Sequence, residues 1–389
     1  LNNIRSSPTK LNSKIFLLNE KLSTPIIFEK VTNPLVTIII PVFNNFEFTY
    51  NCLKSIKEHT NNDLIEVVVA DDNSTDETIN IEKYVKNTKV VKNTYSLGFL
   101  MNCNRASMFS KGKYLVFLNN DTQVQPKWLD HLLDIIESDQ SVGLVGPKFI
   151  YPYGKLQEAG GMIWKEGNGL NYGRFDDPEK SEYNYLKEVD YISGACLMIR
   201  KNLWEDIGGF DKRFSPAYFE DVDLAFEVRK KGYKVIYQPK SVVVHYEGIS
   251  HGRNTSSGIK KYQEINRSKF IEKWKKILEK EHFPNEQSLF LERDRSIFKK
   301  HILVIDQYVP HYDQDAGSRT VFSWLKVFKD LDFQITFISD NFSKDEPYTS
   351  KLQQMGIEVL YGLYYATHWP NYLQQNLKYF DYVLLSRSW

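Results

Sequence analysis

Carboxylate and amide side chains gather in two short segments, each directly after a predicted strand. One segment runs from Asp71 to Asp76 and the other reads Asn119-Asn120-Asp121. A nucleotide that carries a diphosphate needs oxygen acceptors close together for its base edge, its ribose and a bound metal ion. The segments therefore predict a nucleotide site in which Asp72 contacts the base or ribose, Asn120 contacts the ribose, and Asp121 binds Mg²⁺ or Mn²⁺.

The first segment also has a structural interpretation, because Ser74, Thr75 and Asp76 are good helix-capping residues. Both interpretations can hold at once. The chain contains no G-x-x-x-x-G-K-[ST] loop, and no G-x-G-x-x-G follows a strand. These absences weaken kinase, ATPase and dinucleotide interpretations. Phosphate must then be held by a metal ion and by side chains.

A third acidic group contains Glu220, Asp221 and Asp223, downstream of the turn Phe210-Asp211. One interpretation is a charged helix start, which the helix dipole favours. The other is a loop that arrives at a helix terminus and aims one carboxylate at a substrate hydroxyl. An aspartate with a reference pKa of about 3.9 is ionised at neutral pH and can accept that proton.

The elements that must position these groups alternate along the chain. Strands are predicted at 36–43, 64–70, 88–91 and 113–118, and helices at 46–59, 75–86, 98–110 and 126–138. Such alternation predicts an α/β fold with a mostly parallel sheet and helices on both faces. Ligands of such sheets lie outside the carboxyl ends of the strands, which is where the acidic segments fall.

Four parts are predicted along the chain. Residues 1–34 form a lead-in segment, 35–258 an α/β domain whose second half binds the acceptor, 259–299 a helical linker and 300–389 a second α/β unit. The helix expected at 259–281 either packs between the domains or lies on a membrane surface. In the last unit we expect strands at 301–309, 334–339 and 380–385, and helices at 318–331 and 350–355.

Composition restricts the classes of partner. Lys and Arg total 50 against 49 Asp and Glu, so a net charge of +1 provides no field to attract nucleic acid. Cys52, Cys103 and Cys196 are widely spaced and odd in number, which favours a reducing compartment over a disulfide framework. No apolar run reaches the roughly 20 residues of a membrane span, and no signal peptide is evident. The absence of an initiator Met suggests an excised fragment.

Several motifs, in this order, resemble those of family 2 glycosyltransferases with the GT-A fold, a Rossmann-like mixed sheet that binds nucleotide sugars. The resemblance covers about residues 35–252 and is nearest to the rhamnosyltransferase-like branch. The motifs are Pro41-Val42-Phe43-Asn44, Asp71-Asp72-Asn73-Ser74, Ser96-Leu97-Gly98-Phe99 with Asn102 and Arg105, Asn119-Asn120-Asp121, Ser193-Gly194-Ala195, and Gly208-Gly209-Phe210-Asp211 with Glu220-Asp221.

The resemblance implies inverting transfer of a sugar from a UDP-, dTDP- or GDP-linked donor to a glycan or lipid-linked glycan, as in bacterial polysaccharide or O-antigen synthesis. It also implies a cytoplasmic protein, with peripheral contact at the inner face of the membrane as a further expectation. Asp221 would be the catalytic base with Glu220 beside it, and His245 would join Asp121 at the metal or diphosphate. The alternative for His245 is a structural histidine at a strand end. The expected nucleotide-binding residues are Pro41, Val42, Asn44, Asp72, Gly98, Asn102, Arg105, Asn119 and Asn120, and the expected acceptor-binding residues are Ser193, Gly194 and Ala195.

The D-x-D motif of many relatives is Asn119-Asn120-Asp121 here, so one carboxylate is missing and metal binding leans on substrate phosphates. This departure leaves a degenerate glycan-binding or scaffold domain as one alternative. A sugar-nucleotide pyrophosphorylase is another, although no Gly-rich loop follows the first strand. Residues 300–389, with Asp315-Ala316-Gly317-Ser318-Arg319, resemble the amino-terminal half of a family 4 glycosyltransferase of the GT-B fold, a partial Rossmann-like unit.

Overall fold

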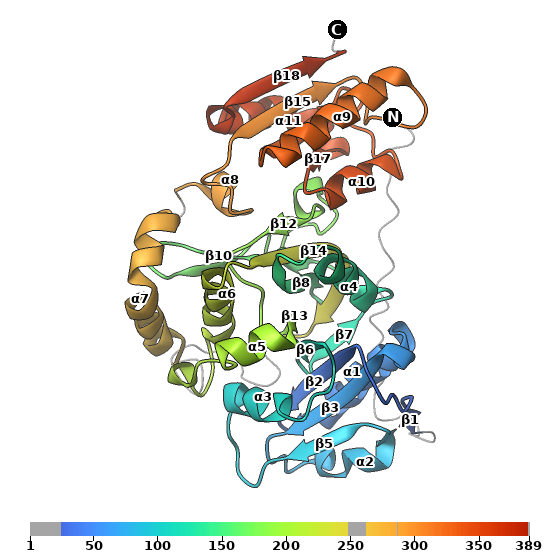
Figure 1. The fold of residues 1–389 in the computed structure, drawn as a ribbon, viewed down its shortest axis with the longest axis vertical. Helices are drawn as coiled ribbons and strands as arrows, with labels where there is room; N and C mark the ends of the chain where they lie inside the picture. The colour runs from blue at the N-terminus through green and yellow to red at the C-terminus, as the bar shows by residue number, and fades with distance from the viewer. Residues whose placement is uncertain (1–24, 248–261, 286, 388–389) are drawn as a thin grey trace. The chain divides into compact units, whose positions relative to one another are not determined.

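The computed structural model describes residues 25–247, 262–285 and 287–387, and these fold into two compact units (Figure 1). The large unit comprises the described residues of 11–176 and 189–285, and the small unit those of 177–188 and 286–389. The start of the predicted lead-in segment and residues 248–258 of the predicted first domain lie outside the described residues. The three predicted boundaries between the four parts stay predictions.

The large unit is built on a mixed sheet with the strand order β14-β8-β13-β6-β2-β3-β5. The interior strand β2 (Val36–Val42) pairs in parallel with β3 (Ile65–Asp71) and β6 (Tyr114–Leu118), and β3 pairs in parallel with β5 (Lys89–Lys92). All seven residues of β2 are buried, as expected for a strand covered on both faces. The parallel half of the sheet was predicted correctly.

The other half of the sheet contains a reversed strand. β13 (Cys196–Arg200) runs antiparallel to both β6 and β8 (Val142–Ile150), and β8 pairs in parallel with β14 (Lys234–His245). Two short strands extend this half, β7 (Thr122–Val124) on β14 and β9 (Leu156–Glu158) on β8. Because β13 lies between β6 and β8, the segment that precedes it lies beside the carboxyl end of β6.

Most helices predicted for the large unit are present, one predicted helix is much shorter, and the helix at 201–207 was not predicted. The observed helices are α1 (Phe46–His59), α3 (Phe99–Ser107), α4 (Trp128–Ser138), α5 (Lys201–Ile207) and α6 (Glu220–Lys230). The helix predicted at 75–86 is only a 3₁₀ turn (Glu77–Asn80) and one α-helical turn, α2 (Ile81–Tyr84). The chain leaves the helix because Val85 is buried in strand β4 (Val85–Lys86), which pairs with β1 (Ile26–Ile27).

Helix α7 (Tyr262–Glu281) belongs to the large unit. Its buried residues include Phe270 and Trp274, whose rings pack against Phe226 of α6 with centroids 4.9 and 5.3 Å away. This contact uses the apolar face that the sequence assigned either to interdomain packing or to a membrane. No helix within residues 25–247, 262–285 and 287–387 is long and apolar enough to cross a membrane.

The small unit has a parallel sheet with the order β17-β16-β15-β18. Its strands are β15 (His301–Asp306), β16 (Gln334–Ser339), β17 (Glu358–Leu360) and β18 (Tyr382–Ser386), and its main helices are α9 (Ala316–Asp330), α10 (Tyr348–Gln354) and α11 (Leu363–Asn376). The sequence predictions lacked β17 and α11. Pro370 interrupts the helical pattern of α11 and concealed it.

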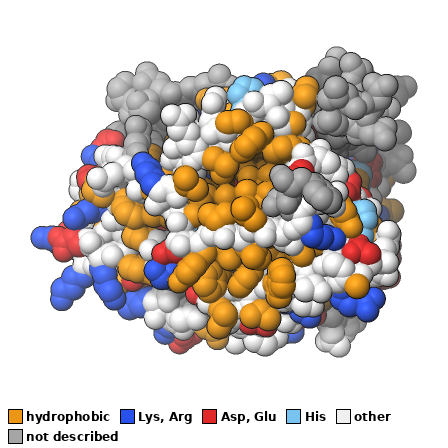
Figure 2. All heavy atoms as spheres, turned by 90° about the horizontal axis from the view of Figure 1, so that it is seen from above, with side chains coloured by type: hydrophobic (Ala, Val, Ile, Leu, Met, Phe, Trp, Pro, Cys, Tyr) orange, Lys and Arg blue, Asp and Glu red, His pale blue; other side chains and the backbone are white. Residues whose placement is uncertain are grey.

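Residues 177–188 belong to the small unit although they interrupt the large one in sequence. Tyr185 Oη donates to Asp294 Oδ2 over 2.8 Å, and Leu186 N donates to the Gln353 carbonyl over 2.9 Å. The small unit also exposes large apolar side chains, which include Trp324, Val327, Leu331, Leu363, Tyr364, Trp369, Tyr382, Val383 and Leu385. Figure 2 shows hydrophobic side chains gathered on one face of the molecule.

Candidate functional site

The carboxyl ends of β2 and β3 are tied together by Asn44 and the turn that follows β3. Asn44 has a left-handed backbone (φ 56°), which places both its N–H and its side chain against this turn. Its N–H donates to Ser74 Oγ over 2.8 Å, and its Oδ1 accepts from Thr75 N over 2.7 Å. The side chains of Pro41 and Val42 are buried within β2. Asn44 therefore shapes the rim of the predicted nucleotide site.

Asp72 organises the loop that leads into α3. Its Oδ1 accepts from Asn93 Nδ2 and Leu97 N over 2.7 Å each, and its Oδ2 accepts from Ser96 Oγ (2.7 Å) and Gly98 N (2.9 Å). The residue is only 5% exposed. Both carboxylate oxygens thus already accept hydrogen bonds from within the protein. A contact of Asp72 with the base or ribose stays a prediction, and the structure adds a role in fixing this loop.

Gly98, Asn102 and Arg105 attach α3 to the sheet. Gly98 has a φ of 78°, and a Cβ there would lie 3.1 Å from Pro216 Cβ, so a larger residue would be strained. Asn102 Nδ2 donates to the Ala70 carbonyl over 2.7 Å, and Arg105 Nη1 donates to the Lys92 carbonyl over 3.1 Å. Asn102 is 1% exposed. A contact of Asn102 with the nucleotide stays a prediction, and the structure adds a role in attaching α3 to β3.

The segment after β6 is held by neighbours on both sides. Asn119 N donates to the Ala195 carbonyl over 2.9 Å, and Asn120 Nδ2 donates to Thr49 Oγ1 over 3.0 Å. The carbonyl of Asp121 accepts from Tyr246 N over 3.0 Å. These contacts hold the backbone of the segment that carries Asp121.

Asp121 and His245 lie close together, and their role as a metal pair stays a prediction. Asp121 Oδ1 lies 3.3 Å from His245 Nε2, and strands β7 and β14 bring them together by pairing Thr122 with His245. Two ligands at about 2.1 Å from one ion, at right angles, are separated by about 3 Å, so this spacing fits a shared cation. No group of three or more such ligands occurs in the described part of the chain. Diphosphate oxygens and water would complete the coordination.

Asp221 lies beside the segment Ser193-Gly194-Ala195. Gly194 N donates to Asp221 Oδ2 over 2.9 Å, and Val222 N donates to Asp221 Oδ1 over 2.8 Å. Burial raises the pKa of Asp221, and these two N–H groups oppose the rise by stabilising the ionised form. Asp221 also lies in the first turn of α6, where the helix dipole favours negative charge. The residue is thus held as an oriented carboxylate.

Two further carboxyl groups surround Asp221, and the sequence predictions lacked one of them. Burial and the neighbouring Asp221 raise the pKa of Glu158, on β9, from 4.5 to about 8. The same two causes raise the pKa of Glu220 well above its usual value. Glu158 is therefore largely protonated at neutral pH, while two backbone N–H groups stabilise the ionised form of Asp221. The available sequence signal for Glu158 was a carboxylate inside the apolar pattern Leu156 to Ala159.

Helix α7 supports the loop that precedes Asp221. Asn266 Nδ2 donates to the carbonyls of Phe214, Ala217 and Tyr218 over 2.7, 2.8 and 3.1 Å. Asn266 is fully buried. Since the chain runs directly from these carbonyls to Phe219 and α6, Asn266 holds the backbone that positions Asp221.

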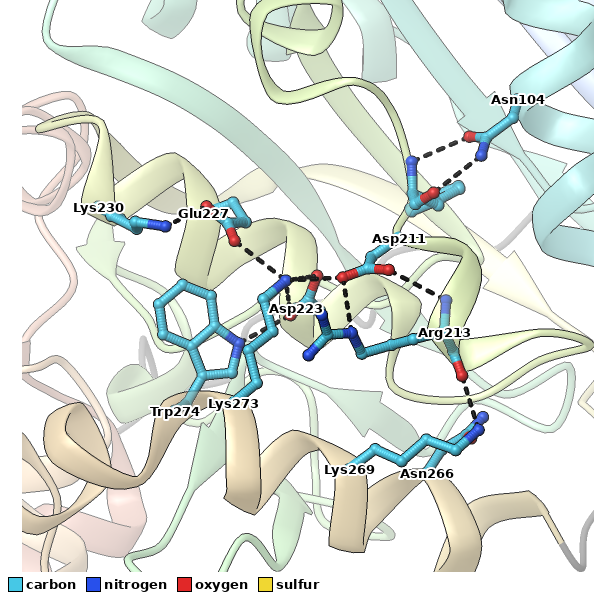
Figure 3. A network of polar contacts seen from close by, with 11 residues as sticks. Asn104, Asp211, Arg213, Asp223, Glu227, Lys230, Asn266, Lys269, Lys273 and Trp274 are labelled. Carbon is cyan, nitrogen blue, oxygen red and sulfur yellow. Dashed lines mark hydrogen bonds and ion pairs between the residues drawn. The ribbon is translucent and has the colours of Figure 1, made fainter.

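An ion network next to it ties α7 to α6. Lys273 Nζ lies 3.0 Å from Asp211 Oδ2, 2.8 Å from an Asp223 carboxylate oxygen and 3.0 Å from Glu227 Oε1 (Figure 3). Trp274 Nε1 also donates to Asp223 Oδ1 over 2.7 Å. The carboxylate of Asp223 is therefore already paired with Lys273 and Trp274 of α7. Asp221 is the carboxylate in the first turn of α6 that contacts the Gly194 segment.

Comparison with known proteins gives the site a context. Residues 37–207 match the sequence profile of glycosyl transferase family 2. The chain is 29% identical over 226 residues to an O-antigen biosynthesis protein of Myxococcus xanthus, across 56% of this chain and 18% of that protein. It is 28% identical over 222 residues to an N-acetylglucosaminyl-diphospho-decaprenol L-rhamnosyltransferase of Mycobacterium tuberculosis, across 50% of this chain and 70% of that protein.

A similar solved structure is a mannosyltransferase of Pyrobaculum calidifontis in complex with GDP-Man and Mn²⁺, at 17% identity and a TM-score of 0.44. That match covers 85% of this chain and 82% of the mannosyltransferase. The chain spans about a fifth of the length of the Myxococcus protein and a quarter of a Sinorhizobium fredii relative that is 28% identical over 229 residues. The match to the family profile ends at residue 207, so the family 4 resemblance of residues 300–389 stays a prediction.

Proposed function

We propose that this chain, whose residues 37–207 match the profile of glycosyl transferase family 2, transfers a sugar from a nucleoside diphosphate to a hydroxyl of a glycan or lipid-linked glycan, with inversion. One geometric relationship carries the proposal. Asp221 accepts a hydrogen bond from Gly194 N. The carbonyl of the next residue, Ala195, accepts one from the N–H of Asn119, which lies two residues before Asp121. A candidate base and a candidate cation pair are thus connected through one backbone segment.

In the proposed reaction, Asp221 removes the proton from the acceptor hydroxyl as its oxygen attacks the anomeric carbon of the donor sugar. The bond from that carbon to the diphosphate breaks, and the nucleoside diphosphate leaves on the opposite face. The protonated state of Glu158 limits the negative charge around Asp221, while the pKa of Asp221, raised by burial, makes it a stronger base than an exposed aspartate. A divalent cation held by Asp121 and His245 would neutralise charge on the leaving diphosphate.

For the donor we propose a UDP-, dTDP- or GDP-linked sugar at the rim formed by Asn44, the loop fixed by Asp72, and Asn120. Similarity to an O-antigen biosynthesis protein and to a rhamnosyltransferase supports a deoxyhexose and a role in bacterial polysaccharide synthesis. The second relative is named for a decaprenol-linked substrate. If the acceptor of this chain is lipid-linked, the proposed reaction would take place at the inner face of the cytoplasmic membrane.

A panel of nucleotide sugars, incubated with and without Mn²⁺, tests the proposal. We expect the protein to release a nucleoside diphosphate slowly from one donor without acceptor, and faster with lipid-linked or free oligosaccharides. Asp221→Asn should bind the same donor and release little product. A wild-type protein that binds no member of the panel, measured by thermal shift, would favour the scaffold interpretation instead.

A further inference from the structure

Three aromatic rings form a row in the large unit, on the turn after β8 and on the segment that pairs with β9. Tyr151 stacks on Tyr153 with centroids 5.0 Å apart and planes 7° apart, and on Phe175 with centroids 5.4 Å apart and planes 6° apart. Tyr151 is buried, but Tyr153 is 65% exposed and Phe175 is 57% exposed. The two outer rings of this aromatic row therefore offer apolar surface to solvent.

The row is fixed in place at some cost to the backbone. Phe175 has a φ of 69°, a left-handed conformation that a bulky residue rarely adopts. Arg174, beside it, donates from Nη2 to both Glu247 oxygens over 2.9 Å and from Nε to Tyr151 Oη over 3.0 Å. Tyr151 Oη donates to Glu247 Oε2 over 2.7 Å. This network holds Tyr151, the middle ring, and adds half-exposed charged groups beside the row.

Short contacts lead from the aromatic row to the proposed base. Phe175 N donates to the Leu156 carbonyl over 2.8 Å, and Leu156 lies two residues before Glu158 on β9. Ser193 N donates to Glu158 Oε1 over 3.4 Å, and the following residue, Gly194, donates to Asp221. The row is also near the cation pair, because Glu247 follows His245 by two residues and Phe149 lies before Tyr151 with its ring 6.1 Å from that of His245.

We propose that Tyr153 and Phe175, at the two ends of the row, each pack against a sugar ring of the acceptor glycan, and that Arg174 and Glu247 bind hydroxyl groups of these sugars. This inference rests on the proposed function. Sugar rings present C–H groups on their faces and hydroxyls around their edges. The C–H groups pack against the electron-rich face of an aromatic ring, while the hydroxyls require charged donors and acceptors nearby. Exposed parallel rings flanked by an arginine and a glutamate supply both.

The matched variants are Tyr153→Ala and Tyr153→Phe. Tyr153 lies on an exposed turn, so both should fold, and the second keeps the ring. Phe175→Ala and Phe175→Tyr form a second pair, with melting temperatures measured for all four. The probe is a printed array of bacterial and synthetic oligosaccharides, read for binding to the protein with Mn²⁺ and nucleoside diphosphate present. Donor binding and slow donor hydrolysis without acceptor are measured on the same preparations.

We expect Tyr153→Ala and Phe175→Ala each to lower binding to the oligosaccharides that the wild type captures by about tenfold, the effect of roughly 1.4 kcal/mol, while Tyr153→Phe and Phe175→Tyr keep it. Donor binding and hydrolysis should not change. Unchanged array binding by a folded Tyr153→Ala and Phe175→Ala would overturn the inference and leave the proposed function standing. The inference would also be overturned if Tyr153→Ala and Phe175→Ala lost binding to anionic lipid vesicles but kept binding to the oligosaccharide array. The row would then be a membrane contact. If the wild-type protein hydrolyses no donor, that result would instead contradict the proposed function.

Discussion

Gly194 donates its backbone N–H to Asp221 Oδ2 over 2.9 Å, and a Cβ on Gly194 would lie 3.5 Å from Asp221 Cβ. The loop before β13 and the start of α6 therefore approach each other closely at this point. Val222 N donates to the other oxygen of the same carboxylate over 2.8 Å. One side chain joins two elements that are distant in sequence, and the predictions for the reaction begin with it.

Asp221→Asn should lower the rate of sugar transfer by about 10²- to 10⁴-fold, because the amide keeps the shape but cannot accept the proton. Donor affinity should stay close to that of the wild type, since the residues proposed to bind the nucleotide lie at the ends of other strands. One backbone N–H loses its acceptor, so we also expect a small drop in melting temperature. Rates, donor affinity by calorimetry and melting curves check this.

Two neighbouring carboxylates provide the controls for that variant. Asp223→Asn should mainly lower the melting temperature, because Asp223 accepts hydrogen bonds from Lys273 and Trp274. Glu220→Gln should change little, because burial and the neighbouring Asp221 raise the pKa of Glu220 and disfavour its ionised form. A folded Asp221→Asn with near-normal turnover, or a Glu220→Gln with the larger loss of rate, would assign the base elsewhere.

Asp121→Ala and His245→Ala should each raise the Mn²⁺ concentration that half-maximal activity requires, because each removes one of two ligands 3.3 Å apart. If both bind one ion, the double variant should lose little more than either single variant. A titration of activity and of nucleotide-dependent stabilisation with Mn²⁺ measures this. Full wild-type activity in excess EDTA would show that side chains stabilise the diphosphate without a metal.

Asp72→Ala should lower both the stability of the fold and the affinity for the bare nucleoside diphosphate. Four donors lose a charged acceptor, and each such bond is worth about 1.5 to 3 kcal/mol, with strong non-additivity among them. Glu82→Ala, which removes an exposed carboxylate of the same unit, is the control. A folded Asp72→Ala with unchanged nucleotide affinity would separate the loop at 93–98 from the nucleotide site.

Glu158→Gln should make the protein less sensitive to alkaline pH. The pKa of Glu158 rises from 4.5 to about 8 on folding, so between these values the native state binds more protons than the unfolded state. The stability from this group is therefore complete below pH 4.5 and is lost as the pH rises toward 8, by at most about 1.4 kcal/mol per pH unit.

The glutamine stays neutral, so the variant should unfold at a higher urea concentration than the wild type at pH 8, and at a similar concentration at pH 4.5. Urea titrations at several pH values measure the difference. Parallel pH profiles for the two proteins would mean that Glu158 is ionised in the native state.

Asn266→Ala should lower the rate of sugar transfer, although Asn266 lies on α7. The substitution acts indirectly, by loosening the loop that carries Asp221. Three carbonyls lose their donor, for which we expect a loss of about 1 to 3 kcal/mol in the free energy of unfolding. Because Asp221 loses its support, kcat should fall while the donor affinity stays unchanged. Gln263→Ala, an exposed amide of the same helix, is the control. A loss of stability with normal kcat would limit Asn266 to a structural role.

Local patterns in the chain were sufficient for the parallel half of the large sheet and for several residues of the site. The continuous apolar run at 36–43 and the acidic residues after each strand placed Asn44, Asp72 and Asp121 at one edge, because parallel strands bring their carboxyl ends together. Helix α1 was predicted with its observed bounds, since its apolar periodicity is regular.

Tertiary structure decided what each polar group does. The sequence offers Asp72, Asn102, Glu220, Asp221 and Asp223 as comparable polar residues, but burial and partners distinguish them. Asp72 fixes a loop, Asp223 meets Lys273 of a distant helix, and Asp221 alone receives Gly194. Nothing local to Glu158 or Asn266 indicates that they lie behind the same carboxylate. The pKa of a carboxyl group and the position of a loop depend on neighbours that only the folded chain brings within a few ångströms.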